Sequence, residues 1–451
     1  MASVHFTPEQ LNERFEFAQK FKNIVFGLIG IGIALILVGA LFFGDSHEEA
    51  TDSHAAITTE QVSNAVPVAD TPDDHGEGGH AHHHRGTEGR LVSNFLLCSL
   101  YFLTISMGAL FFLAVHQIGN GGWHTAIRRV PEAMTTYLPV AAVGFVALFF
   151  FMDVIYEWLI LPPGVDALID TKRAFLNRPA FIIRNVIFFG IWIGAALWLR
   201  RLSIRQDTEG GLSHFHLSTR ISAAFVFLFA FSYSLFAVDW IKSLEPHWFS
   251  TIFGVYVFAG SFQSAMIVTG FLLYFLKRQG YMSYVNDSHF HDVFKYAFGF
   301  SVFWGYIFVA QYLLIWYSNI PEEGIYYVKR YLVDSHDYVG GNFIWLFWTN
   351  VLCCFLIPFL GFMMRDAKRD PRWFIPVGLV VLYGHWQDLF VMIMPGAMGT
   401  EWGIGLIEVG FFSVFAGLFL YVVFNGLSKA NLAAANHPYM EESLHHTTGP
   451  I

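Results

Sequence analysis

The sequence predicts an all-α polytopic membrane protein with ten transmembrane helices, arranged as two tandem four-helix bundles plus two flanking helices. Hydrophobic residues make up 55% of the 451 positions and charged residues only 14%, whereas a soluble domain carries about 25% charged residues. The mean hydropathy is +0.48. The apolar residues gather in ten runs of about 20 residues, a length that crosses about 30 Å of hydrocarbon. We therefore expect the lipid bilayer to be the main solvent of this chain.

Residues 1–22 predict a short amphipathic helix on the cytoplasmic membrane surface. Pro8 occupies the first helical position after a capping threonine, and Leu11, Phe15 and Ala18 then fall on one helix face. This helix is expected to lead directly into the first span.

Each following apolar run is predicted to be one membrane span. The expected spans are 23–43, 92–115, 134–158, 182–201, 219–240, 251–277, 291–317, 342–364, 372–394 and 401–425. Spans two to five form the first predicted bundle, 92–240, and spans six to nine form the second, 251–394.

Two polar segments interrupt or follow these runs. The segment 44–91 holds ten acidic and two basic residues together with several histidines, and it predicts a disordered periplasmic loop. A solvated linker is the favoured interpretation, with transition-metal binding by its histidines as the alternative. Residues 426–451 predict a polar cytoplasmic tail.

Lysine and arginine placement predicts the orientation in the membrane. With the N-terminus in the cytoplasm, the cytoplasmic loops hold 17 basic residues and the opposite loops hold 9. The chain is therefore expected to lie in a bacterial cytoplasmic membrane with both termini inside.

An internal repeat supports the two bundles. Asp239 precedes Pro246 by seven residues at the end of the fifth span, and Asp388 precedes Pro395 by seven at the end of the ninth. These spans lie four apart and run in the same direction, which is typical of a parallel repeat.

Ionisable groups inside spans are costly and each requires a reason. The candidates for a proton path are Asp153, Glu157, Asp239, His385, Asp388 and Glu408. Asp153 and Glu157 are expected to share one helix face near the outer end of the third span. His385 and Asp388 are expected to face the same side of the ninth, and Glu408 is expected about two turns inside the tenth. The favoured interpretation is a proton-carrying or headgroup-binding group of residues open to the outside, with a proton half-channel as the preferred role. The alternatives are interfacial carboxylates that reach water or pair with Arg184 or Lys242, and buried interhelical hydrogen bonds.

Several function classes are excluded at this stage. No basic patch favours nucleic-acid binding. The three cysteines lie in apolar runs without a metal-binding spacing, and only His385 lies deep enough in a span to approach a haem. The chain is expected to bind no metal and to carry no catalytic residue of its own.

Two blocks resemble a known family. Residues 236–251, which read FAVDWIKSLEPHWFST, and residues 386–395, which read WQDLFVMIMP, resemble the large membrane subunits of bacterial alternative complex III. Those subunits belong to the NrfD/PsrC-like family. The likeness covers nearly all of residues 20–427, and the chain looks most like the smaller of the two such subunits.

The resemblance implies a fold, an activity and a set of partners. The family's complex oxidises menaquinol and passes electrons to cytochrome c or to a haem–copper oxidase. Haem c and iron–sulfur clusters are held by partner subunits, and a sister NrfD-like subunit lies beside this one. The chain itself would hold no redox centre, although a bound quinone remains open to it, and no catalysis is expected from it in isolation.

Three roles follow for testing. The preferred role is a proton half-channel and scaffold in a quinol:cytochrome c oxidoreductase complex. The second is a quinone-binding subunit with its pocket at Asp153, Glu157 and Arg184. The third is a proton-coupled secondary transporter built on the parallel repeat.

Overall fold

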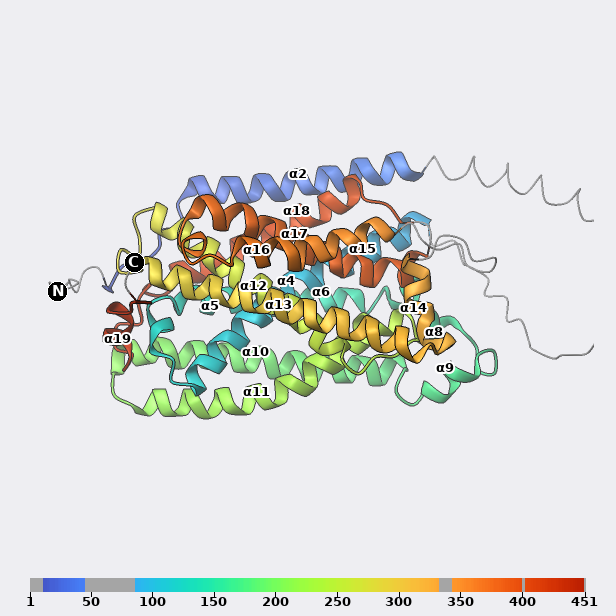
Figure 1. Cartoon of the computed structure of the whole chain (residues 1–451), viewed down its shortest axis with the longest axis horizontal. Coiled ribbons are helices and arrows are strands. Elements are labelled where there is room, and N and C mark those ends of the chain that lie inside the picture. The colour runs from blue at the N-terminus through green and yellow to red at the C-terminus, as the bar shows by residue number, and fades with distance from the viewer. Residues whose placement is uncertain (1–10, 45–85, 332–342, 400–401, 450–451) are drawn as a thin grey trace, which may run out of the picture.

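The computed structural model describes residues 11–44, 86–331, 343–399 and 402–449. Ten of its helices are long and apolar enough to cross a membrane, which confirms the predicted all-α polytopic fold. The described part of the chain contains no β-sheet, only one isolated bridge between Arg14 and Asn431. That bridge places the two ends of the described chain at the same end of the molecule, as an even number of spans requires (Figure 1).

The first bundle consists of α4 (Gly86–Ile118), the pair α5 (Arg129–Met134) and α6 (Leu138–Leu148), α10 (Arg178–Glu209) and α11 (Ser213–Trp240). Helix α4 contacts α6 and α11, and α10 contacts α6 and α11, so the four elements close a ring. A short 3₁₀ turn at Thr135–Tyr137 joins α5 to α6.

The second bundle consists of α12 (Phe253–Arg278), α13 (Asp287–Ser318), the broken span from α15 to α16, and α17 (Pro371–Met398). Helix α4 also contacts α12 and α17 of this bundle. Its apolar stretch is 94% buried, so α4 lies at the centre of the molecule (Figure 1).

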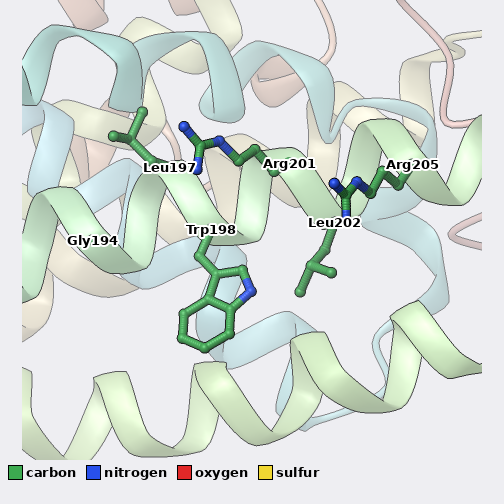
Figure 2. A pocket seen from close by; sticks show the side chains of 6 residues that line it. All are labelled: Gly194, Leu197, Trp198, Arg201, Leu202 and Arg205. Carbon is green, nitrogen blue, oxygen red and sulfur yellow. The ribbon is translucent and has the colours of Figure 1, made fainter.

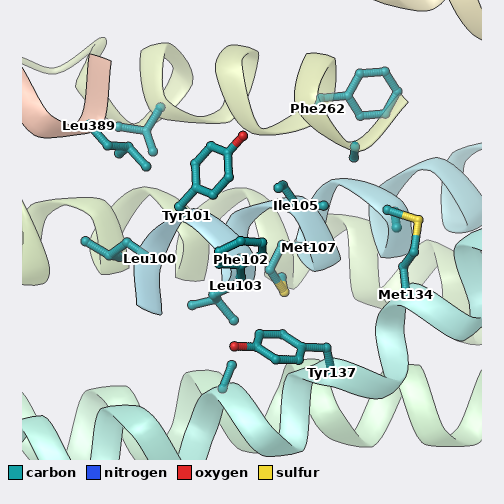
Figure 3. Packing of buried hydrophobic residues seen from close by; sticks show 14 of the residues in the cluster. Leu100, Tyr101, Phe102, Leu103, Ile105, Met107, Met134, Tyr137, Phe262 and Leu389 are labelled. Atoms are coloured by element: carbon teal, nitrogen blue, oxygen red, sulfur yellow. The ribbon is translucent and has the colours of Figure 1, made fainter. Parts of the chain in front are cut away.

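The interior of the protein is apolar and rich in aromatic rings. Figure 3 shows α4 side chains such as Phe102 and Met107 packed between Tyr137 on one side and Phe262 on the other. Tyr101 on α4 donates a hydrogen bond of 2.9 Å to the Leu382 carbonyl of α17. The two bundles therefore share one continuous core.

The flanking helices α2 (Gln19–Gly44) and α18 (Leu406–Ser428) pair with each other along their length. Glycines make this close approach possible. A Cβ on Gly32 would lie 2.7 Å from the Gly410 carbonyl oxygen, and a Cβ on Gly39 would lie 2.7 Å from Ile407.

The third span is shorter than predicted. The helix of this span ends at Leu148, and the chain continues as two single-turn helices, α7 (Met152–Ile155) and α8 (Glu157–Ile160). Tyr156 between them has an extended backbone with φ −102° and ψ 106°. The prediction of one helix over 134–158 is therefore wrong, because periodicity alone cannot reveal a break inside an apolar stretch.

The eighth span contains an irregular turn. Helix α15 (Ile344–Asn350) continues as a π-helix over Val351–Leu356 and then as α16 (Ile357–Gly361). Pro358 sits in the first turn of α16, and its missing N–H removes a regular helical hydrogen bond, which favours such a turn. Asn350 lies at the boundary where the π-helix begins.

Residues outside the spans form further helices. Helix α9 (Ala167–Lys172) follows α8, and α14 (Pro321–Tyr331), which the sequence did not predict, follows α13. Helices α8, α9 and α14 lie at one end of the molecule (Figure 1). Arg330 of α14 is fully buried and forms an ion pair of 2.8 Å with Glu245.

The opposite end differs from the expectation at both chain termini. Residues 13–18 are not helical, contrary to the predicted surface helix over 1–22, and residues 1–10 lie outside the description. Phe15 is buried against Phe275 and Phe424 rather than in lipid. The C-terminal segment folds back and forms α19 (Met440–Leu444) against this end of the bundles, where a polar tail was predicted.

Candidate functional site

Asp153 and Glu157 lie on the two separate helices α7 and α8, so the expectation that they share one helix face is wrong. Asp153 is exposed and forms an ion pair with Arg178 at the start of α10. An exposed pair of this kind contributes little stability and no buried proton site.

Glu408 lies in the first turn of α18, not two turns inside the span as predicted, because the helix begins only at Leu406. Its carboxylate is 1% exposed and accepts two hydrogen bonds of 2.8 Å from Arg90 of α4. It also accepts from Asn94 at 2.8 Å and from the Gly405 backbone N–H at 2.7 Å. A carboxylate so fully occupied by a cation and a helix N-terminus acts as a structural anchor.

Asp239 at the end of α11 is fully buried. Arg184 of α10 donates to both of its oxygens, at 2.8 and 3.2 Å, and Asn185 donates at 3.1 Å. The side-chain oxygen Oδ1 of Asn185 in turn accepts from the Trp240 indole at 2.7 Å. The charge of Asp239 is therefore compensated by a bidentate arginine.

Asp388 on α17 is 5% exposed and has a different environment. Its oxygens accept from the Tyr256 hydroxyl at 2.6 Å, the Trp304 indole at 3.1 Å and the Asn350 amide at 3.2 Å. All three donors are neutral. Among the described residues, no lysine, arginine or histidine forms an ion pair with Asp388.

Asp239 and Asp388, the two aspartates of the predicted internal repeat, share one hydrogen-bond partner type. Each aspartate accepts from an asparagine on the preceding span, Asn185 in the first bundle and Asn350 in the second. The residue just before that asparagine is Arg184 in the first bundle and Thr349 in the second. The second bundle thus retains the carboxylate and the amide but lacks the arginine.

His385 lies one turn before Asp388, but the two side chains have separate hydrogen-bond partners. His385 Nε2 donates to the Gln263 side-chain oxygen at 2.7 Å, so its Nδ1 is left as an acceptor. His385 Nδ1, Gln263 Nε2 and Ser264 Oγ are buried without a hydrogen-bond partner among the described residues.

A small cavity joins these groups at the contact between the two bundles. It is lined by His385, Asp388 and Ser264 together with Tyr101 and Thr104 of α4. The space available to the centre of a water molecule is about 10 Å³, which is room for one water. A water there could accept and donate protons between the His385 ring, the Ser264 hydroxyl and the Asp388 carboxylate.

The six predicted proton-path residues therefore form separate groups. Asp388 and His385 share a cavity. Asp153, Asp239 and Glu408 are held in separate ion pairs with Arg178, Arg184 and Arg90, and Glu157 lies apart from them in the first turn of α8. Sequence reasoning missed Asn185, Asn350, Tyr256 and Trp304. These residues are uncharged and far apart in the sequence, so no motif marked them as partners of the aspartates. The two asparagines do lie in the fourth and eighth spans, which match in the predicted repeat.

A second buried polar cluster, also missed, lies at the end of the bundles that carries α19. Glu132 accepts hydrogen bonds of 2.7 Å from both Arg128 and Arg129, and Arg129 also pairs with Asp207 of α10. His437 of the C-terminal segment accepts from Arg128 at 3.1 Å. Burial, reinforced by the nearby Arg128, lowers the pKa of His437 to about 3, so this imidazole is neutral.

The residues present define what this chain could hold. No cluster of three or more histidine, cysteine or acidic side chains suited to a metal occurs in the described ranges. Of the histidine-rich segment 44–91, residues 45–85 lie outside these ranges. The cavity at Asp388 is too small for a quinone ring, and Arg184, named for a quinone pocket, is already bound to Asp239.

Comparison with known proteins yields no match, neither to a family model nor to a curated protein.

Proposed function

We propose that this chain is a membrane subunit of a quinol:cytochrome c oxidoreductase complex of the alternative complex III type, in which Asp388 carries a proton. The carrying observation is the buried Asp388 carboxylate, which is held by three neutral donors while its counterpart Asp239 has an arginine.

Physical chemistry supports a proton-carrying role for that site. Burying an ionised carboxylate without a cation costs much free energy, and protonation of the carboxyl removes that cost. Intramembrane carboxylates that lack a permanent counter-ion are typical of proton relays. His385 and the one-water cavity lie beside Asp388 and would extend the relay by one step.

The partners in this proposal come from the resemblance of residues 236–251 and 386–395 to the family's membrane subunits. Electrons would pass through haem c and iron–sulfur subunits outside the membrane, beside a sister NrfD-like subunit. This chain would scaffold the assembly and supply the proton site. A quinone pocket at Asp153, Glu157 and Arg184 receives less support, because it would require Arg184 to leave Asp239.

Purification of the tagged full chain from native membranes tests the assembly. Haem c and iron–sulfur proteins are expected to co-purify with it. A chain that elutes alone from mild detergent would contradict the complex and favour a transporter.

Turnover of the assembled complex then tests the proton role. Asp388→Asn keeps the shape and the hydrogen bonds of the side chain and removes only the titrating group. We expect intact assembly, slower quinol oxidation and a lower ratio of protons released per electron. An unchanged rate and ratio would contradict the proposal. Glu157→Gln, which lies outside the buried site, is the control.

A further inference from the structure

The outer face of α10 carries a groove near the end of the helix that leads to α11. The groove has a volume of about 360 Å³ and is lined by Gly194, Leu197, Trp198, Arg201, Leu202 and Arg205, as Figure 2 shows. A Cβ on Gly194 would meet no atom within 4 Å, so the groove is open at Gly194.

The depth of the groove matches the boundary between hydrocarbon and headgroups. Trp198 is 53% exposed on a helix whose preceding turns are apolar, and tryptophan is enriched at this level of a bilayer. The Cα atom of Arg201 lies about 4.5 Å further along the helix axis than that of Trp198, and the Cα atom of Arg205 lies about 6 Å beyond that of Arg201. The groove therefore runs from acyl-chain depth to headgroup depth.

The guanidinium groups of Arg201 and Arg205 are available to bind a ligand. Arg201 and Arg205 are exposed, and neither side chain forms a hydrogen bond or ion pair with any residue in the described ranges. Their neighbour Arg200, in contrast, donates to the carbonyl oxygens of Glu132 and Gly426 and stabilises the fold.

The acidic residues nearest in sequence are already engaged. Asp207 pairs with Arg129, and Glu209 lies 2.5 Å from the His214 ring. Within the part of the chain that the structure describes, the positive charge of the groove is thus left without a partner. Arginine forks bind phosphate oxygens well.

We propose that this groove binds an anionic phospholipid. Its phosphate would lie between Arg201 and Arg205, and its acyl chains would lie along Trp198, Leu197 and the open surface at Gly194. Basic pockets at the membrane surface of helical proteins recognise such headgroups, and each arginine near the surface strengthens the attraction about fivefold.

Native mass spectrometry of the delipidated full chain tests the site. Phosphatidylglycerol is titrated against phosphatidylcholine with the same acyl chains. We expect the wild-type chain to bind phosphatidylglycerol more tightly. Arg201→Gln should lose about fivefold in affinity, and the double variant with Arg205→Gln about twenty-five-fold.

Two controls decide the interpretation. Arg278→Gln removes an exposed arginine from the end of α12, away from the groove, and should leave binding unchanged. The double variant Arg201→Lys with Arg205→Lys keeps the positive charge and should keep most of the affinity. It shows whether weaker binding of the glutamine variants comes from the lost charge or from misfolding. Equal affinity of the double glutamine variant and the wild type would overturn the proposal. Displacement of the lipid by millimolar inorganic phosphate would overturn the lipid as the ligand.

Discussion

Asp239 and Asp388 occupy matching positions in the internal repeat that the sequence predicts, yet they differ in their hydrogen-bond donors. Arg184 forms a bidentate pair with Asp239, whereas Asp388 is surrounded by a phenol, an indole and an amide. The position before the shared asparagine holds the arginine in one environment and not in the other: it is Arg184 in the first bundle and Thr349 in the second. Tyr256 and Trp304 are further donors to Asp388 alone. We interpret the first aspartate as structural and the second as the proton-carrying residue.

If Asp239 has a structural role, removing its partner Arg184 should lower the free energy of unfolding substantially. Arg184→Gln leaves a fully buried carboxylate without a cation and should reduce the free energy of unfolding by about 3 kcal/mol. Arg178→Gln breaks the exposed pair with Asp153 and should cost less than about 1 kcal/mol. SDS titration in detergent measures both. Similar costs for the two variants would contradict the assignment, and adding Asp239→Asn to Arg184→Gln should recover most of the loss.

At the scale of elements, α2 depends on α18 for its position. The apolar stretch of α2 is only 17% buried, so most of its surface packs against no other part of the described chain. Without a hydrophobic driving force between helices in lipid, close packing at small residues holds such a pair together.

This packing predicts different outcomes for two glycines of one helix. Gly32→Val places a methyl group against the Gly410 backbone and should destabilise the protein by about 1–3 kcal/mol. Gly27→Val meets open space and serves as the matched control, with no expected loss. Thermal unfolding in detergent compares the two. A stability loss of the same size for both variants would show that α2 does not depend on this contact.

The docked C-terminal segment should respond to acid. His437 is buried beside Arg128 and Arg129, with Glu132 nearby, and its pKa is lowered to about 3 from an ordinary value of about 6.5. The undocked segment therefore binds a proton that the docked segment does not. Docking is fully stable above about pH 6.5 and weakens as the pH falls toward 3.

Carboxypeptidase digestion across this pH range measures docking of the segment. Release of the terminal residues should accelerate as the pH falls, after correction for the enzyme's own pH profile. In His437→Gln the pH dependence should become weaker. Digestion of the wild type at one corrected rate throughout would contradict this role of His437.

At the scale of the whole molecule, the structure places α9 and the loop between α10 and α11 at opposite ends of the membrane domain (Figure 1). The count of basic residues predicts that the second end is cytoplasmic. All three native cysteines are buried, so they should react little with the label and introduced cysteines can be detected above them.

This orientation gives a direct labelling prediction. In sealed cells, a cysteine at the exposed position Val165 should react with a membrane-impermeant maleimide, and one at Glu209 should react only after the membrane is opened. The reverse pattern would place both termini outside the cytoplasm.

Local patterns predicted the ten spans because each span is one apolar run of consecutive residues, whose length can be counted in the sequence. The break before Asp153 was missed, since the residues around it remain apolar. Pairs such as Arg90 with Glu408, which lie 318 positions apart, could not be assigned, because the sequence does not say which helices become neighbours. The same limit hid the neutral donors around Asp388.

Infrared spectroscopy of the purified full chain tests most directly whether Asp388 is the proton-carrying carboxyl. Difference spectra between pH steps should contain a carbonyl stretching band of a buried carboxylic acid that changes with pH. The account predicts that Asp388→Asn removes this band and that Asp239→Asn retains it. A band that persists in Asp388→Asn, or that disappears in Asp239→Asn instead, would contradict the central claim.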